Sequence, residues 1–592
     1  MTDLTEYPNA VAPVMEWASS RSDQDAVVLL GDDVDAPAEH ISYAELDRRA
    51  RGVAAWLAAR LPTGSRVLLV YPPVGFITGF LGCLYAGMIA VPAPLPGNYR
   101  HERRRVRRIA ADAGVAAVLT DVRSLATVIE WTRQHELTQP PVLATDGPDV
   151  ADPGTWPGTG PAPDSLALLQ YTSGSTGEPK GVMVGHDNLL ANAALMARTL
   201  HIAPGTRFGG WAPHYHDMGL MAQTLPALLR GSTCVLLSPG AFVRRPVRWL
   251  QAIDRYDIGW SAAPNFGYEL CTRRISAADM ATVDLSRWRH AVNGSEPVRA
   301  DTMAAFADHA AVAGFRPESA SSCYGLAEAT VFVSGAPPRT PTVARVDSQA
   351  LANLEFRAAG PDDAARRLPG NGSAAGYDVR VVDPVTRAVL PPGRIGELWL
   401  RGPSVARGYW GNAGATEETF RARTADADGG FLRTGDLGLV DDGEIYVTGR
   451  MKEMMVLHGR NLYPQDIEQE LRAHHPELGN IGAAFSVETS ATDDREALVV
   501  THELRERIPG PGLRDLAVGM RQTVTREFGV GAAGIVLLRR GHVRRTTSGK
   551  IERSAMRKMF LAGELEALHS DLSPALAAHR TARSGADEAA AR

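Results

Sequence analysis

The chain has 592 residues, more than one ordinary domain holds, so several domains or subdomains are expected. Hydrophobic residues make up 44% and charged residues 22% of it, as in ordinary globular proteins. The net charge of −5 gives no basic balance of the kind that points to nucleic acid. The start of the chain lacks the basic and apolar runs of a secretory signal. No Cys-x-x-Cys pair occurs that would suggest a zinc site or a disulfide framework. A reduced, cytoplasmic setting is therefore expected. The cysteines are scattered: Cys83, Cys234, Cys271 and Cys323.

The segment from Val67 to Tyr99 contains no charged residue and is long enough to span a bilayer. Prolines and glycines interrupt it throughout. We therefore predict a strand over Arg66–Tyr71, a buried helix over about Val74–Ala90 and then a turn or strand, rather than a membrane span. Similar short apolar runs alternate with helical patterns over the first 450 residues, which predicts a large α/β region with mainly parallel sheets.

The basic run Arg100–Arg108 (RHERRRVRR) follows that segment. Its first interpretation is the solvated face of a helix, and a docking patch for an acidic partner is the alternative. The aromatic or groove-reading motifs that would accompany nucleic-acid binding are missing from the sequence.

The strongest local signal is YTSGSTGEPKG (171–181), which follows an apolar segment and precedes a predicted helix near Asp187. Its glycines allow close backbone approach to a ligand, and its hydroxyl groups, backbone N–H groups and one lysine can surround phosphate oxygens. It is not the common nucleotide P-loop, because Pro179 precedes Lys180 and Gly181 follows it.

The remaining chain divides by composition. Residues 335–373 are rich in Pro, Gly and Ala and are expected to be an insertion between two ordered parts. Short strands and turns from Tyr377 to Trp410 predict a small β-rich subdomain. We expect a large N-terminal domain over 1–450, a small, mobile C-terminal α/β domain over 451–572 and a flexible tail over 573–592.

Five motifs occur in a fixed order over roughly 380 residues: YTSGSTGEPKG (171–181), YGLAE (324–328), RTGDLG (433–438), GRMKE (449–453) and TSGKIER (547–553). With these motifs the sequence resembles the adenylate-forming superfamily of acyl-CoA synthetases, luciferases and peptide-synthetase adenylation domains. The resemblance implies, in the same order, a phosphate loop, an adenine and magnesium motif, a ribose motif, a hinge and a catalytic-lysine motif.

Further segments make the sequence resemble the fatty acyl-AMP ligases more closely than the CoA ligases. In that family an extra segment after the position of Ser334 contacts the small domain and hinders productive use of coenzyme A. Here VARVDSQALANLEF (343–356) matches that segment in character, although LPGNGSAAG (368–376) lacks the cysteine found in many members. The other segments are FLGCLYAGMIAVPAP (80–94), PHYHDMGL (213–220), APNFGYELC (263–271), NGSEPV (293–298), YGLAEATVFVS (324–334) and HGRNLYPQDIE (458–468).

The resemblance also implies roles for single residues. Lys550 would neutralise the charge that develops when a carboxylate attacks the α-phosphate of ATP, and His216 would meet the carboxylate or the phosphate. Glu328, with Thr176, would hold Mg²⁺, a hard ion that prefers oxygen ligands. Lys452 would lie at the hinge. The acyl-pocket candidates are Phe266, Gly267 and Tyr268. The candidates for binding ATP or AMP are Thr172, Ser173, Gly174, Ser175, Thr176, Gly177, Lys180, Asn293, Gly294, Ser295, Glu296, Tyr324, Gly325, Asp436 and Arg450.

The expected function follows from these motifs. A medium- or long-chain fatty acid and ATP would give acyl-AMP and pyrophosphate, and the acyl group would pass to the phosphopantetheine thiol of an acyl carrier protein or polyketide synthase acting in trans. One alternative is a fatty acyl-CoA synthetase, which the insertion argues against. The other is a catalytically silent module that binds an adenylate or lipid, which the retained Lys550, Glu328 and Asp436 argue against. Neither nucleic acid nor a membrane span is expected as part of this function.

Overall fold

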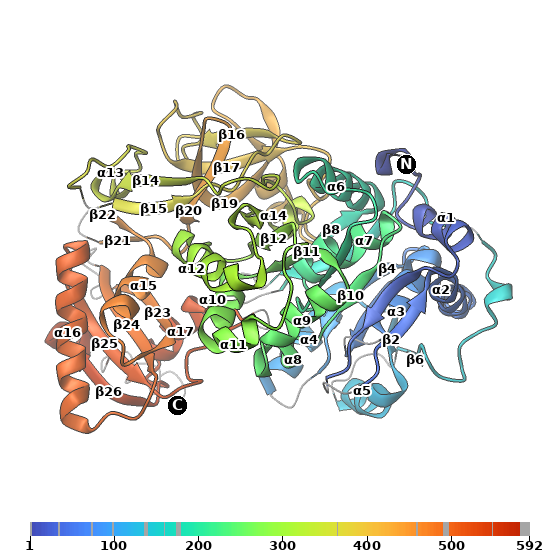
Figure 1. Ribbon diagram of the computed structural model, residues 1–592, viewed down its shortest axis with the longest axis horizontal. Helices are drawn as coiled ribbons and strands as arrows, with labels where there is room; N and C mark the ends of the chain where they lie inside the picture. Colours follow the sequence, from blue (N-terminus) through green and yellow to red (C-terminus); the bar gives the residue numbers. More distant parts are fainter. Residues whose placement is uncertain are drawn as a thin grey trace.

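The computed structural model describes residues 3–32, 36–72, 75–96, 100–134, 140–158, 160–172, 179–363, 365–457, 460–488, 496–546 and 549–580. Two parts lie side by side (Figure 1). A large body holds two mainly parallel sheets and a β-rich sheet, and the last quarter of the chain forms a smaller unit around its own sheet. The predicted α/β class with mainly parallel sheets is confirmed.

The first parallel sheet has the strand order β6-β5-β3-β4-β7-β8, and only β8 runs antiparallel to its neighbour. The predicted buried βα unit is present: β3 leads into α3, all of whose residues are buried, and then into β4. None of the described helices is long and apolar enough to cross a membrane. The elements are β3 (Arg66–Tyr71), α3 (Phe76–Tyr85), β4 (Ile89–Pro94), α4 (Arg100–Ala113), β5 (Ala117–Thr120), α5 (Val122–Gln134), β6 (Val142–Ala144), β7 (Leu166–Thr172) and β8 (Lys180–Gly185).

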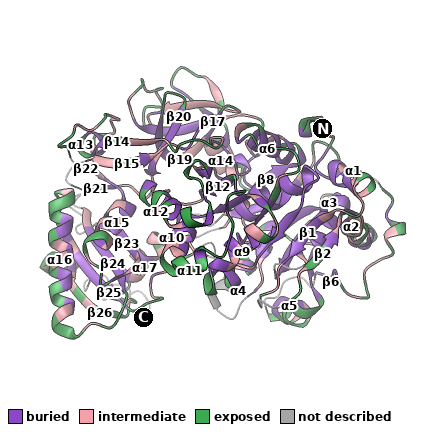
Figure 2. Cartoon of the chain, in the orientation of Figure 1, coloured by how far each residue is buried: buried purple, intermediate pink, exposed green. Residues whose placement is uncertain are grey.

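The second sheet has the order β13-β12-β11-β9-β10-β1-β2 and is parallel except at β2. Its strands are largely buried (Figure 2), as expected for strands covered by helices on both faces. The elements are α1 (Ala12–Ser20), β1 (Asp25–Leu29), β2 (Glu39–Ser42), α2 (Tyr43–Ala58), α6 (His186–Thr199), β9 (Arg207–Gly210), the π-helix η3 (Met218–Thr224), α7 (Leu225–Leu229), β10 (Cys234–Leu236), α8 (Pro239–Arg244), α9 (Val247–Arg255), β11 (Ile258–Ala263), α10 (Asn265–Arg274), α11 (Ala277–Met280), β12 (His290–Asn293), α12 (Ala300–Ala310) and β13 (Ala320–Ser322).

The β-rich sheet is larger than the sequence indicated, because it continues to Arg450. Its long hairpin of β19 and β20 places Asp436 directly opposite Arg450. The elements are β16 (Asp378–Val382), β17 (Gly396–Arg401), α14 (Ala413–Phe420), β18 (Ala422–Arg423), β19 (Gly429–Asp441) and β20 (Glu444–Arg450).

The insertion (335–373) is an ordered element that touches both parts of the molecule. It contains the antiparallel pair β14 (Val343–Asp347) and β15 (Ala365–Pro369) with α13 (Ser348–Ala352) between them. Its apolar side chains share one buried cluster with residues of β19 and β20 and with Tyr463 of the small unit. Arg366 forms an ion pair with Asp466, at 2.7 Å, and the Asn461 side chain donates to the Ala352 carbonyl at 2.9 Å.

The small unit is a four-stranded sheet with helices on both faces. One core lies under α15 and α16, and a second lies under α17. Within the segment predicted as a tail, residues 574–580 are helical and Leu576 is fully buried in the second core. The elements are β21 (Met455–Leu457), β22 (Arg460–Leu462), α15 (Pro464–His474), β23 (Leu478–Glu488), β24 (Glu496–Leu504), α16 (Gly510–Phe528), β25 (Ala532–Leu538), α17 (Arg553–Leu561) and β26 (Ala567–Leu572).

Candidate active site

Tyr324, which follows β13 of the second parallel sheet, forms one contiguous group with Asp436 and Arg450 of the β-rich sheet. The Tyr324 hydroxyl donates to Asp436 Oδ2 at 2.8 Å, and Arg450 Nε contacts Asp436 Oδ1 at 3.2 Å. The Asp436 carboxylate raises the pKa of Arg450, and burial raises the pKa of Tyr324, so the first stays charged and the second keeps its proton. A buried carboxylate fixed in this way can accept hydrogen bonds from two neighbouring hydroxyl groups, as a ribose offers.

Glu328 lies close to the same group, next to a residue that the sequence analysis missed. The Tyr409 hydroxyl donates to Glu328 Oε1 at 2.8 Å. The ammonium group of Lys180 lies 4.7 Å from the centre of the Tyr409 ring, which is within cation–π range. Tyr409 thus connects the predicted metal ligand with the lysine of the phosphate-loop motif. Its only signal in the sequence is an aromatic residue in an otherwise unremarked Gly-Tyr-Trp segment.

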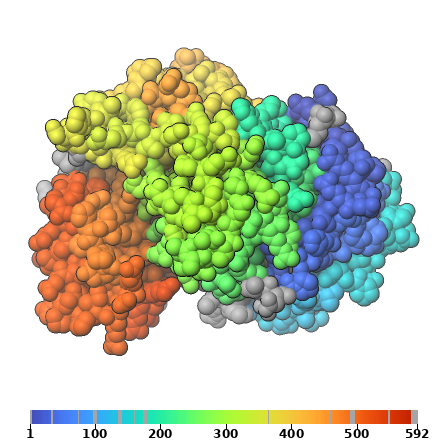
Figure 3. Space-filling view, viewed as in Figure 1, coloured from blue at the N-terminus to red at the C-terminus, as the bar shows by residue number. Residues whose placement is uncertain are grey.

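Lys550 is presented by a tight turn of the small unit. The Thr546 N–H donates to the Lys550 carbonyl at 2.8 Å, the Lys550 N–H donates to Thr546 Oγ1 at 3.1 Å, and Gly549 adopts a φ of 86°. A Cβ at Gly549 would lie 3.3 Å from the Phe266 ring, so this turn sits directly on α10 of the large body. The seam between the two parts is visible where the orange and green regions meet (Figure 3).

The charges around Lys550 come from both parts. Burial lowers the pKa of Lys550, while the carboxylate of Asp217 acts in the opposite direction. Burial also lowers the pKa of His216 to about 4, so its imidazole is neutral at pH 7. Arg450 and Asp436 belong to the same electrostatic environment. The structure therefore brings the predicted catalytic lysine, His216 and the ribose-motif residues to one place.

The predicted adenine-side residues lie at the end of β12, where Asn293 is the last strand residue, and on the loop that follows it. Glu296 accepts the Phe266 N–H at 2.7 Å, and burial raises the pKa of its carboxyl group. Asn293 donates to Asn265 Oδ1 at 3.2 Å. Glu296 and Asn293 thus fix the start of α10.

The loop that carries Tyr324 requires glycine at position 325. A Cβ at Gly325 would lie 1.7 Å from the Val331 carbonyl oxygen.

The three acyl-pocket candidates do not line the apolar pocket described below, and their role stays a prediction. Tyr268 is fully buried among aromatic side chains and donates to the Val292 carbonyl at 3.0 Å, Gly267 packs on Trp211, and Phe266 faces the turn of Lys550. A mainly apolar pocket instead opens beside Tyr324. It is lined by Met196, Leu200, Asp217, Met218, Ala222, Trp260, Ala262, Val292, Gly294, Ser295, Cys323, Tyr324, Gly325, Val331 and Phe332.

The remaining candidates belong to the phosphate-loop motif and the predicted hinge. Thr172 ends β7 and pairs with Lys180 on β8, whereas Ser173, Gly174, Ser175, Thr176 and Gly177 lie outside the described residues. Lys452 is exposed in the turn after β20, beside Glu453, whose carboxylate pairs with Arg553 at 2.7 Å. Its hinge role stays a prediction.

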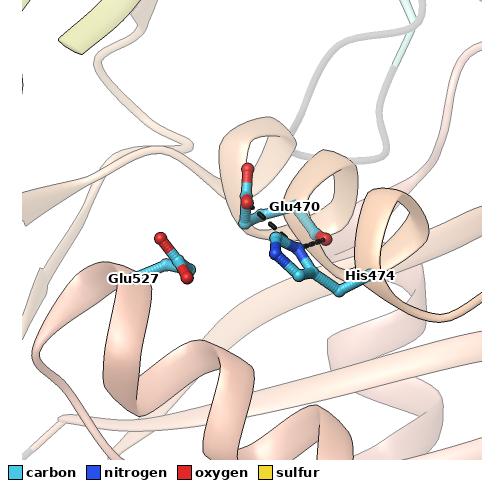
Figure 4. Close-up of side chains that lie close together, drawn as sticks. All are labelled: Glu470, His474 and Glu527. Carbon is cyan, nitrogen blue, oxygen red and sulfur yellow. Dashed lines mark hydrogen bonds and ion pairs between the residues drawn. The ribbon is translucent and has the colours of Figure 1, made fainter. Parts of the chain in front are cut away.

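A separate group of possible metal ligands lies on the surface of the small unit, between α15 and α16 (Figure 4). It consists of Glu470, His474 and Glu527. His474 Nδ1 already contacts Glu470 Oε1 at 3.1 Å. Exposed acidic groups of this kind are common without an ion, and this one is not part of the site around Lys550.

Comparison with known proteins identifies the family. The family model of AMP-binding enzymes matches residues 14–410. A medium-chain-fatty-acid–[acyl-carrier-protein] ligase of Moorena producens is 38% identical over 89% of this chain and 90% of its own length. A 4-hydroxyphenylalkanoate adenylyltransferase of Mycobacterium marinum is 36% identical over 88% of this chain and 86% of its own.

Solved structures give the same result. The fatty acid AMP ligase of Legionella pneumophila superposes with a TM-score of 0.75 and 32% identity over 97% of this chain and 99% of that one. A structure from work on fatty acyl-adenylate ligases of Escherichia coli and L. pneumophila gives a TM-score of 0.83 and 30% identity over 94% and 98% of the two chains. The chain therefore belongs to the AMP-binding enzymes and, within them, to the fatty acyl-AMP ligases that its motifs predicted.

Proposed function

We propose that this protein activates a fatty acid with ATP as an acyl-adenylate and transfers the acyl group to the thiol of an acyl carrier protein. The observation that carries the proposal is that the charges of Asp217 and Asp436 both act on Lys550, while Asp436 is hydrogen-bonded to Tyr324 and both Asp217 and Tyr324 line the apolar pocket. This arrangement offers a cation for the reacting carboxylate and phosphate, an acceptor for the ribose and an apolar lining against which an alkyl chain can pack. Each methylene buried there would contribute about 0.8 kcal/mol.

In this reaction the protein forms no covalent bond to the substrate; it orients the reactants and stabilises charge. A carboxylate oxygen attacks the α-phosphorus of ATP, and negative charge builds up on the oxygens of both groups. Lys550 would neutralise this charge, and Asp436 would hold the ribose so that the α-phosphate stays in line. His216, neutral at pH 7, can donate one hydrogen bond to an oxygen without adding a charge.

Glu328 fits the predicted magnesium site. One of its carboxylate oxygens accepts from Tyr409, which orients the group and leaves lone pairs on both oxygens for a hard cation. Thr176 is the second proposed ligand. A bound Mg²⁺ would screen the phosphate charges.

The choice of a carrier thiol over free coenzyme A is supported by the insertion and by relatives. The insertion contacts the small unit through Arg366 and Asn461, as the family resemblance implies for a segment that hinders CoA use. Two relatives, from Moorena producens and Teredinibacter turnerae, are named as medium-chain-fatty-acid–[acyl-carrier-protein] ligases. Use of ATP and four unpaired cysteines favour the cytoplasm as the place of action.

Acid-dependent exchange of pyrophosphate into ATP tests the first half-reaction. Saturated acids of medium and long chain and 4-hydroxyphenylalkanoic acids should be compared, with acyl-AMP identified by mass spectrometry. We expect exchange with at least one fatty acid and none without acid. If ATP binds but no acid supports exchange or forms acyl-AMP, the protein is a silent binding module and the proposal is wrong.

A further inference from the structure

The basic run Arg100–Arg108 forms the first two thirds of α4, and the sheet topology places this helix beside β7, the strand that leads into the phosphate-loop motif. Strands β4 and β7 are parallel neighbours, so both leave the sheet at the same edge. Helix α4 follows β4 and therefore starts at that edge, where ligands bind in open parallel sheets. Thr172, the last residue of β7, lies at the same edge and opens the phosphate-loop motif.

One stripe of α4 faces β7. The Tyr171 hydroxyl donates to Asp112 Oδ2 at 2.5 Å, and Ile109 packs in the same buried cluster as Tyr171. Arg105 precedes Ile109 by four residues and Asp112 by seven, so all three share this stripe. Seven residues of helix span about 10 Å, which carries Arg105 from the level of Tyr171 toward the edge where the phosphate loop begins.

The surroundings of Arg105 differ from those of the neighbouring arginines. Arg104 and Arg107 are exposed, whereas Arg105 is half-buried. Burial lowers the pKa of Arg105, and the Glu552 carboxylate of the small unit, two residues from Lys550, acts in the opposite direction. Arg105 is also one of the cations that lower the pKa of His216. Its place on the stripe that faces β7 and its partial burial thus bring the guanidinium group within electrostatic reach of His216 and Glu552.

We propose that Arg105 binds the β- and γ-phosphates of ATP and stabilises pyrophosphate as it leaves, an inference that rests on the proposed function. In that step the carboxylate oxygen forms a bond to the α-phosphorus. The bond from the α-phosphorus to the bridging oxygen breaks, and its electron pair leaves on pyrophosphate. The guanidinium fork of Arg105 can donate two parallel hydrogen bonds to the oxygens that gain this charge. Within the described part of the chain, the Glu552 carboxylate is the main anionic influence on the same group.

Isothermal titration with ATP, pyrophosphate and AMP, each with Mg²⁺, tests the assignment. Arg105→Ala should weaken ATP and pyrophosphate binding by roughly 10- to 100-fold, the range for losing a charge-assisted contact, and leave AMP binding unchanged because AMP lacks the β- and γ-phosphates. Arg105→Lys should recover part of the loss. Arg104→Ala, an exposed arginine on the same helix, should bind all three like the parent protein.

Two outcomes would overturn the inference. If Arg105→Ala weakens the binding of AMP and ATP equally, the variant has a general structural defect. A lowered melting temperature of Arg105→Gln would confirm that Arg105 has a structural role. The same selective loss in Glu552→Gln would show that Arg105 acts only by seating the turn of Lys550. These binding results do not depend on acyl transfer. A protein that binds polyphosphate through Arg105 but never forms acyl-AMP would therefore refute the proposed function and leave this assignment standing.

Discussion

Arg366 connects the insertion to the small unit, and its replacement by alanine is the most informative single change. Its guanidinium group pairs with Asp466 at 2.7 Å and lies 5.4 Å from the centre of the Tyr463 ring. The neighbouring residue, Arg367, points to the other side of β15 and pairs with Asp301 of the large body. Arg366→Ala therefore weakens the contact between the two parts, and Arg367→Ala serves as its matched control.

The size of the effect follows from the exposure of the pair. The two side chains of the Arg366–Asp466 pair are 22% and 21% exposed, between the fully exposed and fully buried cases. Exposed pairs contribute up to about 1 kcal/mol, and breaking buried ones costs about 3–5 kcal/mol, so a loss of about 2 kcal/mol is expected here. Asp466 limits the loss by taking up a proton, because burial already raises its pKa. In one state the small unit lies against the insertion, and in the other it has moved away. A loss of about 2 kcal/mol changes the ratio of these two populations by roughly 30-fold.

Acyl transfer from preformed acyl-AMP to free coenzyme A is the assay. Arg366→Ala should raise the rate of this transfer by roughly 10- to 30-fold, because the small unit would more often leave the position in which Lys550 lies against the large body. Arg367→Ala should change the rate little. The fold of each variant can be followed by its melting temperature. If Arg366→Ala is folded and uses CoA no faster than Arg367→Ala, the insertion does not restrain the small unit through this contact.

Three further predictions follow from the site and the core. Lys550→Ala should lower acid-dependent adenylation by about 10²- to 10³-fold but still transfer the acyl group of supplied acyl-AMP. The control Lys558→Ala, on the exposed side of α17, should be normal in both assays. Near-normal pyrophosphate exchange in Lys550→Ala would exclude Lys550 as the charge-neutralising residue. Ala222→Phe should fill the pocket and shorten the longest acid accepted by several methylenes, which competition between acids would show; an unchanged preference would place the chain elsewhere. Burial lowers the pKa of His186 and His502 to about 4, below their unfolded value near 6.5, so the unfolded state binds more protons and the free energy of unfolding should fall as pH drops from about 6.5 to 4, by up to about 1.4 kcal/mol per pH unit for each histidine. Denaturant unfolding at pH 7 and pH 5 measures this loss, and equal stability would contradict it.

The sequence predicted the parts of the site that short motifs encode. Asp436 and Arg450 belong to separate motifs, yet the hairpin of β19 and β20 pairs them directly. Tyr324 and Gly325 share one motif, and the glycine is needed because the Val331 carbonyl approaches it. Such local patterns carry enough information for a prediction. The roles assigned to these residues stay predictions until variants are measured.

The pocket could not be predicted from sequence in the same way. Met196, Ala222 and Trp260 come from α6, η3 and β11, which meet only through the order of strands in the second sheet. Tyr268 looked like a pocket residue because its motif adjoins the site, but its ring is held in an aromatic core. Tyr409 approaches Glu328 across 81 residues of sequence separation. Leu576 completes a core that the composition of the tail does not reveal.

Transfer of acyl-AMP to a carrier thiol would distinguish this protein from an acyl-CoA synthetase. The most direct measurement loads the enzyme with one accepted fatty acid and ATP and then offers holo carrier protein and free coenzyme A at equal concentration. Both products are quantified by mass spectrometry. We expect acylated carrier protein with little acyl-CoA. Rapid, predominant acyl-CoA formation would contradict this expectation and identify the protein as an acyl-CoA synthetase.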